Sequence, residues 1–227
     1  VKIQDLAVDI YDSSYDASYC VYVGSNAKHI EIKNCVFKDA TSVNVRCYNY
    51  DILKVIDCSF TVKSGSVGLQ GDGGFIQDNG IVRDCVFFAR TGGAGTGVYQ
   101  FSSIKDCRFE NLDVGVQTEG YDVHAVIDGN NFENCDYGVY CNTSSYRTTI
   151  VNNKLRSSNS SAIHLKNAQG NYVISNNHIW DGSGDYGIYI EDSRGGSITG
   201  NIIKGCSLSI GIYIDGGGDS YTNSVII

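Results

Sequence analysis

Three carboxylates recur at one position of a repeated pattern, where they could act as acids or bases. Glu119, Glu191 and Asp215 each follow a three-residue run that begins with Val or Ile. If these runs are strands on adjacent coils, Glu191 and Asp215 lie about 5 Å apart, a separation typical of retaining glycosidases. Such proximity raises the pKa of one carboxyl group, whereas a neighbouring Lys166 would keep Glu191 ionised. We predict Glu191 and Asp215 as a catalytic pair, with Glu119 as a further candidate; the alternative is a solvated, ion-paired row.

The middle residues of these runs form a second set, which is rich in aromatic side chains. The expected outward column is Tyr22, Asn44, Gly68, Tyr99, Gln117, Tyr140, His164, Tyr189 and Tyr213. Aromatic rings pack on the C–H faces of sugars, and phenol hydroxyls supply hydrogen bonds. The predicted substrate-binding residues are Tyr99, Gln117, Tyr140, His164, Tyr189 and Tyr213. The alternative is that the rings only stack on one another, because aromatic residues favour strands.

The carboxylates belong to the next outward column along the same strands. Its expected members are Gly24, Arg46, Gln70, Phe101, Glu119, Asn142, Lys166, Glu191 and Asp215. Successive side chains of a strand alternate between its two faces, so both columns are expected to face solvent.

A repeated hexapeptide sets the elements that must position these residues. It consists of an aliphatic residue, a spacer, a small or polar residue, Cys or Asn, a spacer, and Phe or an aliphatic residue. The clear copies centre on Cys35, Cys58, Cys85, Cys107, Asn130, Asn153, Asn177 and Asn201. Their centres lie 22 to 27 residues apart. A fixed period of this length with alternating apolar residues indicates a β-solenoid with one coil per repeat.

The predicted fold is therefore an all-β parallel β-helix of about nine coils in a single domain over residues 1–227. Gly97, Gly115, Gly138 and Gly187 each precede a second short strand, where Gly suits a bend with positive φ or crowded backbones. We expect the chain to be a piece of a longer or assembled protein, because an uncovered β-helix end is an open sheet edge.

Two internal ladders are predicted from the repeat centres. Cys35, Cys58, Cys85 and Cys107 should stack as small buried hydrophobes, since side chains in parallel register have poor disulfide geometry. Free thiols in the core favour folding in a reducing compartment. The Asn ladder at positions 130, 153, 177 and 201 should be structural, because stacked amides hydrogen-bond along the axis.

Composition limits the possible partners. The net charge of −8 disfavours nucleic acid, and there is no apolar run of 18 residues that would span a membrane. Nothing in the pattern of His, Cys and acidic residues has metal-ligand spacing, so neither a metal nor another cofactor is expected.

The I-x-[ND]-C-x-F and I-x-[GN]-N-x-[IFL] units, together with the G-[IV]-Y-[IC] strands, resemble those of the pectin-lyase-like, right-handed parallel β-helix superfamily over essentially the whole chain. The resemblance implies a right-handed helix. The superfamily includes pectate lyases, polygalacturonases, mannuronan epimerases, phage tailspike depolymerases and non-enzymatic surface proteins, so the fold does not fix the function. The chain lacks the Asp-Asp, His-Gly and Asp-Pro-His-Asp motifs of its enzymes, and Ile179-Trp180-Asp181-Gly182 echoes the pectate-lyase run without its His.

The sequence thus predicts a β-helix that recognises a polysaccharide or cell-surface glycan, with cleavage by a hydrolase or lyase reaction left open. The resemblance to tailspikes implies a virion-type or cell-surface location and a homo-oligomer, either a trimer or an end-to-end assembly. The alternative is a non-enzymatic structural or adhesive solenoid, such as a fibre or filament subunit.

Overall fold

The structure of the chain is a computed structural model. It describes residues 1–9, 18–24, 27–48, 50–72, 79–90, 95–120, 124–143, 147–156, 158–168, 172–193, 195–205, 210–216 and 225–226. In this part of the chain the regular elements are all β-strands, and they form three parallel sheets.

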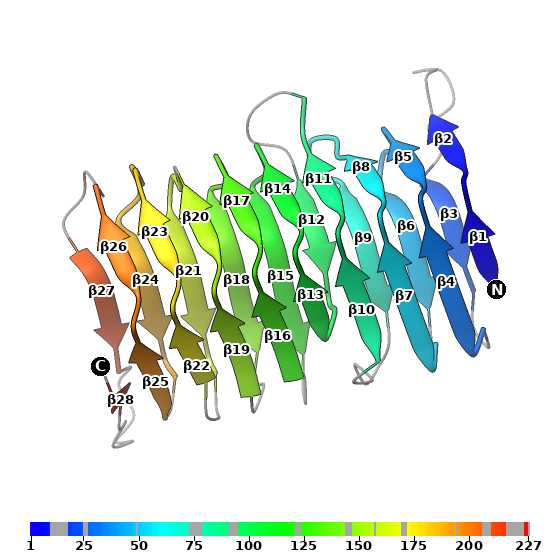
Figure 1. The fold of residues 1–227 in the computed structure, drawn as a ribbon. Helices are drawn as coiled ribbons and strands as arrows, with labels where there is room; N and C mark the ends of the chain where they lie inside the picture. Colours follow the sequence, from blue (N-terminus) through cyan, green and yellow to red (C-terminus); the bar gives the residue numbers. More distant parts are fainter. Residues whose placement is uncertain are drawn as a thin grey trace.

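Each sheet collects one strand from every coil (Figure 1). Sheet A contains β1 (Lys2–Gln4), β4 (His29–Lys33), β7 (Ile52–Ile56), β10 (Gly80–Arg83), β13 (Ser103–Lys105), β16 (His124–Asp128), β19 (Arg147–Val151), β22 (Tyr172–Ser175), β25 (Gly196–Thr199) and β28 (Val225–Ile226). Sheet B contains β2 (Ala7–Asp9), β5 (Val36–Lys38), β8 (Ser59–Thr61), β11 (Val86–Phe88), β14 (Arg108–Glu110), β17 (Asn131–Glu133), β20 (Lys154–Arg156), β23 (His178–Trp180) and β26 (Ile202–Lys204). Sheet C contains β3 (Tyr19–Val23), β6 (Val43–Tyr48), β9 (Val67–Asp72), β12 (Thr96–Tyr99), β15 (Val114–Gly120), β18 (Tyr137–Thr143), β21 (Ser161–Lys166), β24 (Tyr186–Glu191) and β27 (Ile210–Asp215).

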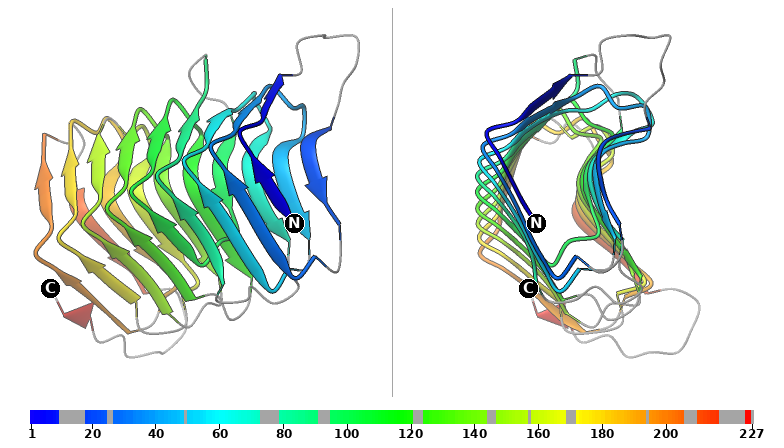
Figure 2. Two further views of the ribbon diagram at one scale, coloured as in Figure 1. Left: turned by 45° about the vertical axis from the view of Figure 1, so that its right-hand side comes forward. Right: turned by 90° about the vertical axis from the view of Figure 1, so that its right-hand side faces the viewer.

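The predicted parallel β-helix is confirmed. Viewed along its axis, the coils superpose, sheets A and B meet at an angle, and sheet C closes each coil and bends inwards (Figure 2). The register places equivalent repeat positions side by side, as in Ile104 with Ile127 and Ile127 with Ile150. A side chain on any coil therefore has its repeat equivalents as neighbours along the axis.

The corner between sheets A and B explains the small or polar residue of the hexapeptide. That residue has φ between +52° and +71° in the coils centred on Cys35 to Asn201, as Asp57, Asp106, Gly129 and Asn152 illustrate. This left-handed conformation is tolerated by Gly, Asn and Asp and by few other residues. One such residue per coil turns the chain from sheet A into sheet B.

The Cys and Asn ladders follow this corner and are confirmed, and their members are buried except for the half-buried Asn201. The thiols of Cys35, Cys58 and Cys85 are free, and each donates to the carbonyl two residues earlier, over 3.1–3.2 Å. In the Asn ladder, Asn153 Oδ1 accepts from the backbone N–H of Asn130 at 2.9 Å and from its side-chain amide at 3.0 Å. Backbone and amide groups that would be orphaned in the core are satisfied from one coil to the next.

Stacked phenyl rings fill the core beneath sheet B. Phe37, Phe60, Phe87, Phe109 and Phe132 are buried, and successive ring centroids lie 4.5–5.3 Å apart. In the following coils Leu155, Ile179 and Ile203 occupy the equivalent positions.

Every strand of sheet C has a kink two residues from its start. Pairing passes from Tyr137 with Ser161 directly to Val139 with Ile163, which skips Gly138. A Cβ on Gly138 would lie 2.5 Å from Leu155 Cδ2 and 2.8 Å from the carbonyl oxygen of Ala162. Of the two predicted reasons for Gly at this position, crowding of adjacent backbones is the correct one, since these glycines do not have positive φ.

Candidate ligand-binding surface

Six rings form a continuous row on the outer face of sheet C. This aromatic row consists of Tyr137, Tyr140, His164, Tyr186, Tyr189 and Tyr213. Ring centroids lie 5.1 Å apart for Tyr140–His164, 4.5 Å for His164–Tyr189 and 5.4 Å for Tyr189–Tyr213. The register places all six predicted binding residues in one column, in the order Tyr99, Gln117, Tyr140, His164, Tyr189 and Tyr213, and the last four contribute rings to the row.

The kink in the strand places a second aromatic ring beside this column in some coils. In a regular strand, residues three apart point to opposite faces. Because Gly138 and the buried Val139 both occupy the inner side, Tyr137 and Tyr140 lie on the same face with centroids 5.4 Å apart. The same geometry brings Tyr186 to 4.8 Å from Tyr189.

Tyr137 and Tyr186 were missed in the sequence analysis. The signal was present as a tetrapeptide, Tyr-Gly-aliphatic-Tyr, which recurs at residues 137–140 and 186–189. This signal can be used only if the Gly is known to mark a kink, because strict alternation of side chains would place Tyr137 and Tyr186 on the inner face.

The prediction was wrong for part of the outward column in the N-terminal coils. Asn44 is buried, and its side-chain amide donates to the Thr61 carbonyl at 2.8 Å. Gly68 lies in the kink, where a Cβ would meet the Gly97 carbonyl oxygen at 2.7 Å and the Phe87 ring at 2.9 Å. The register instead pairs Tyr22 with Arg46, Arg46 with Gln70 and Gln70 with Tyr99. Arg46 and Gln70 therefore belong to the tyrosine column and not to the carboxylate column. The shift is two residues, and Asn44 and Gly68 are buried because they lie at the kink, which the pairing skips.

Phe101 was also misplaced in the carboxylate column. It is fully buried and stacks on Tyr50 at 6.5 Å, because Gln100 before it has φ of 62° and turns the chain inwards. The C-terminal part of this column is confirmed, with the order Glu119, Asn142, Lys166, Glu191 and Asp215 on consecutive coils.

Glu191 is held between two donors on the preceding coil. His164 Nε2 lies 3.0 Å from Glu191 Oε2, and Lys166 Nζ lies 2.8 Å from Glu191 Oε1. Burial opposes ionisation, but the bonds from Lys166 and His164 outweigh it and lower the pKa of Glu191. Glu191 is therefore a carboxylate at neutral pH. It can accept hydrogen bonds or act as a base or nucleophile, but it is poorly suited to donate a proton.

His164 is the most buried member of the aromatic row, with 8% of its surface exposed. Burial lowers the pKa of His164, and the hydrogen bond with Glu191 offsets this only in part. The ring is neutral near pH 7, so its Nε2–H donates to the ionised Glu191.

Glu119 forms a separate polar cluster on this surface. The Tyr99 hydroxyl donates to Glu119 Oε2 at 2.8 Å, and the Gln117 side-chain amide donates to Glu119 Oε1 at 2.6 Å. Three predicted site residues, Tyr99, Gln117 and Glu119, therefore meet in this cluster. Both of these donors are neutral groups.

The buried His164–Glu191 pair predicts a loss of stability in acid. The folded-state pKa of His164 lies below 6.5, so the unfolded chain binds the proton first and the free energy of unfolding falls as pH drops below about 6.5. Glu191, whose folded pKa lies below 4.5, adds a second loss below that pH. Urea unfolding across this pH range should show both steps. His164→Gln should remove the upper step and Glu191→Gln the lower one, and an unchanged upper slope in His164→Gln would contradict the assignment.

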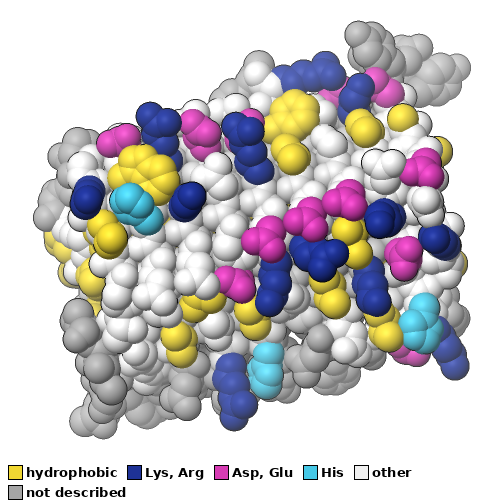
Figure 3. Space-filling model, in the orientation of Figure 1, with side chains coloured by type: hydrophobic (Ala, Val, Ile, Leu, Met, Phe, Trp, Pro, Cys, Tyr) yellow, Lys and Arg dark blue, Asp and Glu magenta, His cyan; other side chains and the backbone are white. Residues whose placement is uncertain are grey.

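The faces of sheets A and B carry a different kind of surface. Acidic and basic side chains are interspersed across them (Figure 3), with ion pairs such as Lys33–Asp57 at 3.9 Å and Lys105–Asp128 at 3.7 Å. These pairs are exposed and contribute little to stability. The faces of sheets A and B are therefore solvated and ion-paired, in contrast to the aromatic row on sheet C.

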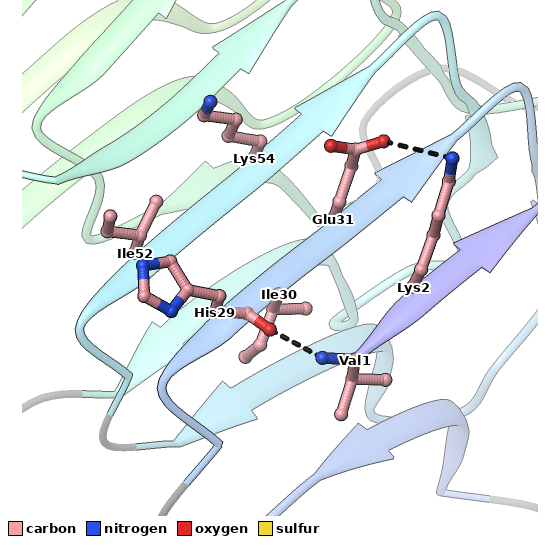
Figure 4. Close-up of a pocket in the computed structure, with 7 residues that line it drawn as sticks. All are labelled: Val1, Lys2, His29, Ile30, Glu31, Ile52 and Lys54. Atoms are coloured by element: carbon pink, nitrogen blue, oxygen red, sulfur yellow. Dashed lines mark hydrogen bonds and ion pairs between the residues drawn. The ribbon is translucent and has the colours of Figure 1, made fainter.

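A pocket of about 260 Å³ lies beside β1 at one edge of sheet A (Figure 4). It is lined by Val1, Lys2, His29, Ile30, Glu31, Ile52 and Lys54. Lys2 and Glu31 lie 3.7 Å apart in it, and the Val1 ammonium donates to the His29 carbonyl at 2.5 Å. None of the predicted site residues lines this pocket.

No group of three or more His, Cys, Asp or Glu side chains among the described residues is arranged to hold a metal ion. The buried thiols of Cys47 and Cys135, which lie outside the ladder, are poor ligands as well, because burial raises the pKa of each to about 12. The described part of the chain likewise contains no helix that could cross a lipid bilayer.

The three parallel sheets, the left-handed corners and the internal ladders define a right-handed parallel β-helix protein. The chain belongs to the family described as the right-handed beta helix region, which matches residues 94–227, and to the family described as periplasmic copper-binding protein (NosD), which matches residues 9–156. No curated protein and no solved structure matches the chain.

Proposed function

We propose that this β-helix binds a glycan along sheet C, across the aromatic row and its neighbouring carboxylates. The observation that carries the proposal is the unbroken contact of six rings on a half-exposed face, in register with Lys166, Glu191 and Asp215. Rigid aromatic side chains with polar tips are typical of sites that bind polar ligands.

The rings are presented edge-on to such a ligand. His164 and Tyr189 stack with 23° between their planes, and Tyr186 and Tyr213 with 15°, so the rings cover one another's faces. Within the described part of the chain, the hydroxyls of Tyr140, Tyr189 and Tyr213 form no hydrogen bond. The proposed contact is therefore hydrogen bonding from phenol hydroxyls to sugar hydroxyls, with little stacking on ring faces.

Cleavage is the less favoured form of the proposal. Glu191 and Asp215 are neighbours on adjacent coils, as a retaining pair requires, but Lys166 and His164 keep Glu191 ionised. Asp215 or Glu119 would have to supply the proton. Release of reducing ends from a bound polysaccharide, lost in Glu191→Gln and Asp215→Asn, would establish an enzyme.

The description of the NosD family names a cellular location, the periplasm, and a metal, copper. A periplasmic or other extracytoplasmic location follows if the chain resembles the NosD family in this respect, and it suits a glycan-binding role. The copper of that description finds no support among the described residues, because no metal-type cluster is present there and the chain contains no Met.

The test is a glycan-array screen followed by titration of the hits against paired variants. We expect Tyr140→Phe with Tyr189→Phe, which keeps the rings and removes two hydroxyls, to weaken binding about tenfold or more. Tyr140→Ala with Tyr189→Ala should weaken it further. Tyr22→Ala serves as the control, because this tyrosine is in the same column but 55% exposed and remote from the row. Unchanged affinity in the alanine pair would refute the proposal.

A second candidate is a structural or adhesive solenoid that is trimeric or assembled end to end. It is favoured by the mutual packing of the rings and by the internal bonds of Glu191, which satisfy this surface without a ligand. Absence of glycan binding, together with assembly detected by light scattering that Tyr140→Ala and Tyr189→Ala disrupt, would support it.

A further inference from the structure

We infer that the glycan bound at sheet C is an extended chain with a two-sugar repeat, as in β-1,4-linked polysaccharides, and that it lies along the helix axis with one sugar on each coil. This inference rests on the proposed function and specifies the shape of its ligand. It follows from the spacing of the tyrosine hydroxyls along the aromatic row.

Tyrosine pairs occur on every second coil of the row. Tyr137 and Tyr140 lie on β18, Tyr186 and Tyr189 lie on β24, and β21 lies between these two strands. Ring centroids are 5.4 Å apart in the first pair and 4.8 Å apart in the second. Within the described part of the chain, the hydroxyls of all four tyrosines form no hydrogen bond. Equivalent atoms of the two pairs lie about 9.6 Å apart along the axis, which is twice the spacing of neighbouring strands.

The coil between the pairs presents no phenol. Ser161 and His164 of β21 occupy the two equivalent positions, and both are buried, with 3% and 8% of their surface exposed. The next coil, which contains β27, has Tyr213 alone, because Ile210 occupies the first position. From β18 to β24 the outer face therefore alternates between a coil with two half-exposed phenols and a coil with none.

An extended β-1,4-linked chain has a matching repeat. Its equatorial linkages keep the chain nearly straight, and each sugar is turned by roughly half a turn relative to the sugar before it. The same edge of hydroxyls therefore faces a protein surface at every second sugar. Such a chain advances over two sugars by a distance close to the spacing of the tyrosine pairs, so equivalent sugar hydroxyls would reach both pairs.

Other shapes and orientations do not fit this arrangement. The strands of sheet C superpose when the molecule is viewed along its axis, so the aromatic row is straight (Figure 2). Glucose chains with α-1,4 or β-1,3 linkages curl away from a straight row and do not return the same edge at every second sugar. A curled chain, or a chain that crosses the row, therefore meets one tyrosine pair and misses the other.

The experiment is calorimetric titration of the chain with four uncharged hexasaccharides: cellohexaose and chitohexaose, which are extended, and maltohexaose and laminarihexaose, which curl. Three of them are built from glucose alone, so they differ only in linkage. We expect cellohexaose or chitohexaose to bind at least about tenfold more tightly than either curled chain, because only an extended chain bonds to both pairs. A curled chain that binds as tightly as the extended ones would overturn the inference.

The length of the chain provides a second measurement. A disaccharide reaches one tyrosine pair, a trisaccharide reaches both, and a tetrasaccharide also reaches Tyr213. With oligomers of the extended chain that binds more tightly, affinity should therefore rise from two to four sugars by about fivefold per sugar. A disaccharide that binds as tightly as the tetrasaccharide would overturn the inference, because the chain would then lie across the row.

Tyr137→Phe with Tyr140→Phe removes both hydroxyls of one pair and keeps the rings. We expect these changes to weaken binding of the tetrasaccharide about tenfold and binding of the disaccharide by less than about twofold, since a disaccharide still has the pair on β24. Tyr48→Phe is the matched control, because Tyr48 is an exposed tyrosine of β6 outside the row, and it should change neither affinity. Equal losses for the two sugars in the double variant would overturn the inference.

The failures of the two proposals are distinguishable. A compact or branched glycan that binds on the array and is weakened by Tyr140→Ala with Tyr189→Ala, with no binding of the four hexasaccharides, would overturn the shape inference. It would leave glycan binding at sheet C in place. No binding of the hexasaccharides, and none on the array, would overturn both.

Discussion

Asn153→Ala is expected to lower the free energy of unfolding by about 4 kcal/mol, because it opens several buried hydrogen bonds at once. Asn153 Nδ2 donates to the Ile127 carbonyl at 2.9 Å and to Asn177 Oδ1 at 3.0 Å. Its Oδ1 accepts from the backbone and side chain of Asn130. Alanine would leave these donors and acceptors in the core without water, and unsatisfied groups there cost about 1–3 kcal/mol each.

Urea unfolding, followed by circular dichroism and by the fluorescence of the single tryptophan, Trp180, measures this loss. Asn153→Cys should cost less than Asn153→Ala, since Cys107 occupies the equivalent position and its thiol donates to the Lys105 carbonyl at 3.1 Å. Lys154→Ala, on the exposed side of the same turn, should change stability by less than about 0.5 kcal/mol. A cost below about 1 kcal/mol for Asn153→Ala would show that the ladder is not a major source of stability.

The hexapeptide predicted the fold well because each of its positions answers one local physical demand. The aliphatic residues face the core, and the polar residue adopts the left-handed corner, as Asp57 and Asn152 do. The ladder position must be small or able to hydrogen-bond along the axis, which Cys and Asn both satisfy. These demands recur in every coil at the same spacing, so the period could be read without knowledge of long-range contacts.

The candidate surface was harder to predict, because the kink in sheet C breaks the alternation of side chains. The runs Val43-Asn44-Val45 and Val67-Gly68-Leu69 match the pattern of an apolar residue on each side of an outward one. In the structure they span the kink, and the outward residues are Arg46 and Gln70. The kink brings the backbones of adjacent coils close together, a long-range contact that the alternation of apolar residues does not reveal. Tyr137 and Tyr186 were missed for the same reason.

The chemistry of the carboxylates depended on a contact between coils. The sequence left open whether a close acid pair raises one pKa or Lys166 keeps Glu191 ionised. The second alternative describes the structure, since the bonds from Lys166 and His164 lower the pKa of Glu191. His164 was expected in the column as a binding residue, but its bond to Glu191 requires a side-chain conformation that spacing alone cannot give.

Gly115→Ala is expected to destabilise the chain by about 3 kcal/mol, because the kink leaves no room for a methyl group. A Cβ at Gly115 would lie 2.6 Å from Phe132 Cδ1 and 2.7 Å from the Gly138 carbonyl oxygen. Neither can move easily, since Phe132 stacks on Phe109 at 4.8 Å and the carbonyl belongs to the next coil. Relieving this clash would require the coils to move apart, which would also widen the spacing between rings on the outer face of sheet C.

Gly211→Ala is the matched control for this substitution. It occupies the same position of the last strand of sheet C, where among the described residues a Cβ would meet only methyl groups of Ile203 at 3.8 and 3.9 Å. We expect it to change the urea midpoint little, whereas Gly115→Ala should lower it clearly and weaken glycan binding along with it. Equal effects of the two substitutions would mean that loss of glycine flexibility matters more than crowding. A stable Gly115→Ala chain with unchanged binding would show that the kink does not set the position of the aromatic row.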